Sequence, residues 1–115
     1  METLLEYKGD TMIVRMMGEL DQHYAAELRR AIDAQVTHRG IHKIVFDFSN
    51  VGFMDSSGIG LVMGRYKYVV EKRGKVIIIS SNVYIDRIIK MSGLLKIVEV
   101  YTDLNSALEN IKEVK

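Results

Sequence analysis

The stretch "KIVFDFSNVGFMDSSGIGLVMGRYK", residues 43–67, contains both kinds of element that decide the fold. It begins with a nearly continuous apolar run from Lys43 to Ser49, which is typical of a central strand covered on both faces. Beyond the polar centre of Phe53–Gly60, apolar residues recur at three- and four-residue steps and predict a helix from about Ser57 to Lys72. A buried strand followed by a helix is the repeating unit of an α/β protein.

The residues before this stretch predict a hairpin and a first helix. Leu4–Lys8 and Thr11–Met17 are short strand-like segments separated by the turn residues Gly9 and Asp10. Asp21 is well placed as the N-cap of a helix that ends near Gly40, with cations just before the glycine.

The residues after it repeat the strand–helix alternation twice. The predicted elements are a strand at Lys75–Ser80, a helix at Val83–Met91 capped by Ser81 and Asn82, a strand at Lys96–Val100, and a helix at Leu104–Lys112 capped by Asp103. We therefore predict one α/β domain over residues 1–115. Its N-terminal hairpin leads into a mixed, mainly parallel sheet of about five strands, with about four helices.

Composition narrows the possible partners and surroundings. The net charge is +1, from 16 basic and 15 acidic residues, so it favours neither direct nucleic-acid binding nor an anionic membrane. There is no cysteine, which excludes disulfides and thiolate chemistry. Acids stand where a signal peptide would be basic, and no apolar run approaches the roughly 18 residues of a membrane span. We expect a cytoplasmic protein.

The segment Asp55-Ser56-Ser57-Gly58 has two interpretations. Asp and Ser are favoured N-caps, but one helix needs only one cap. Gly58 and Gly60 then fall in the first helical turn, where each glycine costs roughly 0.5–1 kcal/mol relative to alanine. Helix N-termini favour negative charge, and functional sites of α/β sheets tend to follow the carboxyl ends of strands. The residues alone leave both interpretations open, helix capping and a functional site with accessible backbone N–H groups.

Neither a serine-hydrolase motif at Asp55–Gly58 nor a metal-binding motif at the histidines matches a known pattern. A serine hydrolase needs G-x-S-x-G and a partner histidine, whereas the glycines here follow the serines and the three histidines, His23, His38 and His42, lie elsewhere in the chain. His38 and His42 have no further ligand nearby, so we predict no metal site.

Two further acids need an interpretation. Asp47, near the end of a predicted strand, could accept a phosphoryl group. However, the chain lacks the acidic pair that holds magnesium in response-regulator receivers, so a hydrogen bond between the Asp47 carboxylate and neighbouring loop backbone is the favoured role. Asp21 is explained by N-capping alone, or additionally by contact with a partner near Asp55. Phe53 and Met54, beside the serines, are candidates for partly exposed apolar residues at a protein interface, although core packing is the favoured role.

Three segments carry a resemblance to a known family. "GELD" at residues 18–21, "FMDSSGIGLVMGRYK" at residues 53–67 and "MSGLLKI" at residues 91–97 resemble the anti-sigma factor antagonists of the STAS domain family. The likeness extends over essentially the whole chain, the central segment is the most specific, and sporulation-type antagonists are the most similar. Ile59 stands where the family leads us to expect leucine.

This resemblance implies a regulatory protein that is not an enzyme and needs no cofactor. The unmodified antagonist binds an anti-sigma factor that is also a serine kinase, and so releases a sigma factor. The kinase, which supplies ATP and magnesium, then phosphorylates the first serine, here Ser56, and binding ends until a serine phosphatase removes the phosphate. The implied partner-binding residues are Asp21, Asp55, Ser57, Gly58, Ile59 and Gly60.

The alternative is a small hydrolase or phospho-acceptor domain that uses Ser56 or Asp47.

The phosphorylation that the resemblance implies would add about −1.5 to −2 charges at a helix N-terminus. We therefore predict a change in surface charge and shape and not in fold.

Overall fold

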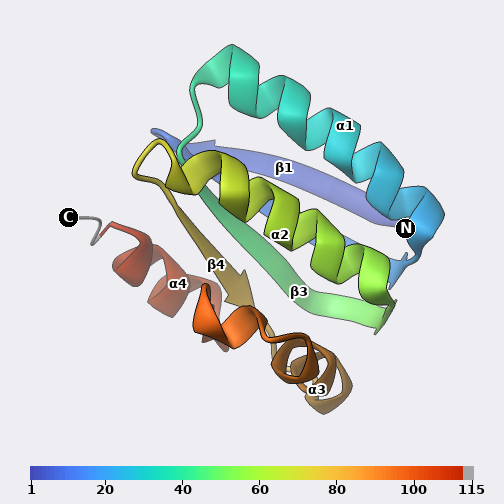
Figure 1. The fold of residues 1–115 in the computed structure, drawn as a ribbon. Coiled ribbons are helices and arrows are strands. Elements are labelled where there is room, and N and C mark those ends of the chain that lie inside the picture. The colour runs from blue at the N-terminus through green and yellow to red at the C-terminus, as the bar shows by residue number, and fades with distance from the viewer. Residues whose placement is uncertain (113–115) are drawn as a thin grey trace.

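A computed structural model describes residues 1–112 (Figure 1). Its elements, in chain order, are β1 (Glu2–Lys8), β2 (Thr11–Leu20), α1 (Gln22–Arg39), β3 (Lys43–Met54), α2 (Ser56–Val70), β4 (Lys75–Ile79), α3 (Val83–Ser92), the 3-10 helix η1 (Leu94–Lys96), β5 (Glu99–Tyr101) and α4 (Leu104–Ile111).

The five strands form one mixed sheet in the order β1-β2-β3-β4-β5. β1 pairs with β2 antiparallel through the hairpin, and every later pair is parallel. This arrangement confirms the predicted fold class. Each parallel pair is joined by a crossover that contains a helix, and the strands lie across the sheet in sequence order.

Successive side chains of each strand point to opposite faces of the sheet, so the core has two layers. The larger layer packs residues of α1, α2 and α3, such as Ile32, Val62 and Ile89, against one face of the sheet. The smaller layer packs Ala107 and Ile111 of α4 against the other face. Figure 1 shows α1 and α2 side by side across the sheet, with α3 near the start of α2.

The strands β2 and β3 are longer than predicted. They end at Leu20 and Met54, beyond the predicted ends at Met17 and Ser49. The two strands continue to pair through two register shifts, and Gly18 adopts a φ of +114°, which L-residues with a side chain rarely adopt. The extra pairing holds the chain extended up to the residue before the N-cap of each of the next two helices.

The last strand is shorter than predicted. Lys96 lies in η1 and not in a strand, because Leu94 is buried and the backbone N–H of Ile97 bonds to its carbonyl in a tight turn. Only Glu99–Tyr101 reaches the edge of the sheet. Among residues 1–112, no helix combines the length and the apolar character required to cross a membrane.

Candidate functional site at the start of helix α2

Asp55 is the N-cap of α2. Its backbone is extended (φ −107°, ψ −168°), and its carboxylate accepts a hydrogen bond of 2.8 Å from the Ser57 N–H. The helix therefore begins at Ser56, one residue before the predicted start at Ser57. Since Asp55 alone provides the side-chain cap, neither serine hydroxyl is needed to start the helix.

Asp21 lies beside this loop because of how β2 and β3 pair. Leu20 and Met54 are register partners at the ends of two parallel strands, so the residues that follow them emerge at the same edge of the sheet. Asp21 caps α1 and accepts a 3.0 Å hydrogen bond from the Tyr24 N–H. Asp21 and Asp55 line one open hollow of about 560 Å³. The structure thus brings together two acids that are distant in the chain.

The adjacent serines face different neighbours. Ser56 is exposed and lines a groove between α2 and α3. Ser57 is half-buried and lines a groove between α2 and α1. Within residues 1–112 the Ser56 hydroxyl takes part in no hydrogen bond. Ser56 is therefore the more exposed of the two serines.

The two glycines of this turn, Gly58 and Gly60, differ in the space around them. A Cβ at Gly58 would overlap Met54 Cγ and Sδ and would lie 3.1 Å from Leu20 Cδ2, so Gly58 is required for packing. A Cβ at Gly60 would have no heavy atom within 4 Å. Packing therefore gives no reason for Gly60, which is exposed at the groove between α1 and α2.

The two apolar residues before Asp55 divide between the two roles that we considered. Met54 is only 1% exposed and belongs to the core, which confirms core packing, the favoured role. Phe53 is exposed, as we considered. Ile59 is half-buried and lines the groove with Ser56. Sequence reasoning missed Ile88 and Met91 of α3, which complete this groove. Only the exposure of Met91, revealed by the structure, distinguishes it from a core methionine.

Comparison with known proteins places this chain in a family. The model of the STAS domain matches residues 3–107. This chain belongs to the STAS domain family. A relative named anti-sigma F factor antagonist, from Paenibacillus polymyxa, is 36% identical over 110 residues, which cover 96% of this chain and 94% of the relative.

Two solved structures have the same fold as this STAS domain. The anti-sigma factor antagonist SpoIIAA in its unphosphorylated form aligns with a TM-score of 0.80 and 23% identity, covering 98% of this chain and 100% of the other. The Bacillus cell fate determinant SpoIIAA in its phosphorylated form aligns with a TM-score of 0.76 and 28% identity, covering 96% and 99%.

The other acid considered as a functional residue has a local role in this STAS domain. Asp47 lies in β3, where its carboxylate accepts hydrogen bonds from the Ser49 N–H at 2.9 Å and the Ser49 hydroxyl at 2.6 Å. Its other oxygen lies 3.9 Å from Arg15 Nε. Asp47 alternates with the buried Phe46 and Phe48, so it faces away from the helical layer that contains Ser56. The two candidate acceptors therefore do not share a site.

The histidines form no catalytic pair with Ser56. His23 lies closer to the site than expected, because it lines the hollow of Asp21 and Asp55. Its Nε2 is 3.5 Å from Glu27 Oε1, and the side chain is 79% exposed. His38 lies in the last turn of α1, and His42 follows that helix, at the opposite end of β3 from Ser56. No group of three His, Asp or Glu residues in the described chain is arranged to hold a metal ion.

Proposed function

We propose that this STAS domain is an anti-sigma factor antagonist controlled by phosphorylation of Ser56. The unmodified form binds an anti-sigma factor that is also a serine kinase, and this binding releases a sigma factor. The single observation that carries the proposal is the exposed Ser56 hydroxyl, which has no hydrogen bond within residues 1–112 and is not needed as a cap. The name of the Paenibacillus polymyxa relative supports the antagonist role.

The position of Ser56 is suited to a phosphate. As the first residue of α2, it lies where free backbone N–H groups and the helix dipole favour negative charge. A phosphoserine here needs no rearrangement of the core, since Ser56 is exposed. The likeness of this fold to both the unphosphorylated and the phosphorylated SpoIIAA structures supports a switch without refolding.

Phosphorylation would change the charge of the binding surface. Asp55 lines the groove that contains Ser56 and shares a neighbouring hollow with Asp21, and phosphate adds about −1.5 to −2 more charges. A partner that had packed its own acids or its ATP phosphates against Ser56 is then repelled and dissociates.

The proposed partner surface consists of Asp21, Asp55, Ser57, Ile59 and Gly60, which are all at least partly exposed. Gly58 is buried and contributes to this surface by positioning it, because it lets α2 start close against Met54 and Leu20.

The remaining components belong to the partners. ATP and magnesium are bound by the kinase, and a serine phosphatase regenerates the unmodified antagonist. The sigma factor released is proposed to be of the sporulation type, in keeping with the anti-sigma F name of the relative. The role of this chain is regulatory, with Ser56 as another protein's substrate.

Phosphate mapping tests the proposal. The purified chain is incubated with a cognate anti-sigma kinase and ATP, and the phosphate is located by mass spectrometry. We expect one phosphate on Ser56, none on the Ser56→Ala variant, and normal modification of the matched Ser57→Ala variant. Phosphate chiefly on Ser57, or no binding of the kinase by the unmodified chain, would refute the proposal.

A further inference from the structure

The groove beside Ser56 is open, and four of its seven lining side chains are apolar. It has a volume of about 360 Å³ and runs between the first turn of α2 and the last turn of α3. Its lining residues are Met54, Asp55, Ser56, Ile59, Ile88, Met91 and Ser92. Asp55 is the one charged residue among them, so the groove is suited to an apolar side chain and not to a charged metabolite.

Helix α3 exposes more apolar surface than its packing requires. Ile85 and Ile89 are fully buried and hold the helix on the sheet. Tyr84, Ile88 and Met91 are spaced by four and three residues, which places them along a second stripe. On this stripe Tyr84 is 49% exposed and Met91 is 80% exposed. Clustered apolar exposure of this kind marks an interaction surface.

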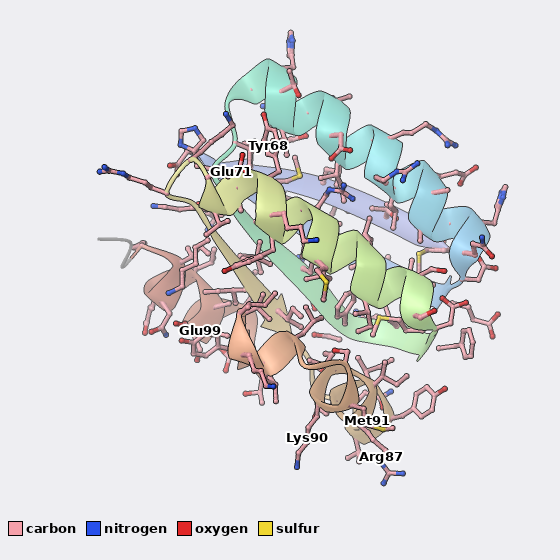
Figure 2. The ribbon with its side chains drawn as sticks, viewed as in Figure 1. Tyr68, Glu71, Arg87, Lys90, Met91 and Glu99 are labelled. Carbon is pink, nitrogen blue, oxygen red and sulfur yellow. The ribbon has the colours of Figure 1, made fainter. Side chains whose placement is uncertain are left out.

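The surroundings of the groove indicate the charge of its occupant. Figure 2 shows the charged side chains of Arg87 and Lys90 pointing away from the sheet on α3. Neither residue lines the groove. Asp55, which lines the groove, also lines the neighbouring hollow together with Asp21. Neither acid has a cation within 4 Å among the described residues. An occupant that carries an apolar side chain and, next to it, a basic side chain would complement both the apolar groove and the two acids.

We infer that the groove between α2 and α3 is the docking site for a large apolar side chain of the anti-sigma factor, flanked by a lysine or arginine that faces Asp21 and Asp55. This inference rests on the proposed function, because the groove is continuous with the phosphorylation site through Ser56. It also explains how one phosphate ends binding. A dianion on the groove rim would have to lose water when the apolar side chain enters, and that desolvation is costly.

The exposed Met91 permits a direct test. Met91→Glu places a charge in the groove without disturbing the core, because the side chain is 80% exposed. The matched control is Val83→Glu, which makes a similar change on the same helix at a residue that is 75% exposed and does not line the groove. Binding of each variant to the anti-sigma kinase is measured by calorimetry, beside wild type and Ser56→Asp, with thermal melting to confirm folding.

We expect Met91→Glu to weaken binding by about tenfold to a hundredfold, the equivalent of losing one buried apolar side chain, while Val83→Glu binds like wild type. If Ser56→Asp fails to bind but Met91→Glu binds normally, the groove inference is wrong and the proposed function stands. If the wild type does not bind, the proposed function itself fails. A wild-type dimer in sedimentation analysis that Met91→Glu converts to monomer would overturn the inference in favour of a second copy as the occupant.

Discussion

A Gly58→Ala substitution should destabilise this domain, although alanine is the better helix former. The new Cβ would overlap Met54 Cγ and Sδ and lie 3.1 Å from Leu20 Cδ2. Both neighbours are at most 1% exposed, so neither can move into solvent. Overpacking of this kind costs about 1–3 kcal/mol, against a gain of about 0.5–1 kcal/mol from replacing a helical glycine. We therefore expect a net loss of about 1 kcal/mol, and of at most about 2.5 kcal/mol.

Gly64→Ala is the matched control in the same helix. A Cβ at Gly64 would have no heavy atom within 4 Å, and the residue lies well inside α2. Only the helix-forming gain applies there, so this variant should be stabilised by about 0.5–1 kcal/mol. The same chemical change is thus expected to act with opposite sign at two positions of one helix.

Urea and thermal unfolding followed by circular dichroism measure both effects. With roughly 4 °C of melting temperature for each kcal/mol in a chain of this size, Gly58→Ala should melt about 4 °C and at most about 10 °C below wild type, and Gly64→Ala about 2–4 °C above it. Because Leu20 and Met54 precede the two capping acids, Gly58→Ala should also weaken partner binding. A Gly58→Ala protein at least as stable as Gly64→Ala would refute the packing explanation.

Two further predictions concern capping and titration. Asp21→Ala and Asp55→Ala should each reduce the free energy of unfolding by about 1 kcal/mol in urea titrations, since each removes the side-chain cap of a helix, and unchanged stability would contradict the capping role. The Tyr101 hydroxyl donates a 2.6 Å hydrogen bond to Glu99 Oε1, which raises the pKa of Tyr101 to about 12. The contribution of this hydrogen bond to the free energy of unfolding is fully present below the ordinary tyrosine pKa and is lost as the pH rises towards about 12. Ultraviolet titration should show one tyrosine with a pKa above the ordinary value, and Glu99→Ala should return this pKa to the ordinary range. A titration curve of the variant identical to that of the wild type would exclude this hydrogen bond.

Local features of the fold could be predicted well from the sequence. Asp21, Asn82 and Asp103 cap α1, α3 and α4 as predicted, because an N-cap depends on a side chain and on N–H groups two or three residues further along the chain. Gly40 ends α1 in a left-handed conformation for the same local reason. The alternation of buried strands and helices in the sequence was sufficient to predict the order of the elements and the fold class.

Boundaries set by partner strands could not be predicted in this way. β2 and β3 extend to Leu20 and Met54 because each supplies hydrogen bonds to the other, with register shifts that neither segment reveals alone. In the same way, Lys96 has a strand-like sequence context, but burial of the preceding Leu94 holds that segment in a 3-10 turn.

The same division applies to the candidate site. The sequence by itself identified Asp55-Ser56-Ser57-Gly58 as unusual for a helix start, and the resemblance singled out Ser56. The tertiary structure decided that Ser56 is the exposed serine, that Gly58 packs on Met54, and which residues meet around them. Asp21 lies near Asp55 because paired parallel strands end at one edge of the sheet, and Met91 of α3 joins the groove because the crossover helices pack on one face. Such contacts depend on the pairing and packing of whole elements, and no local pattern of residues contains them.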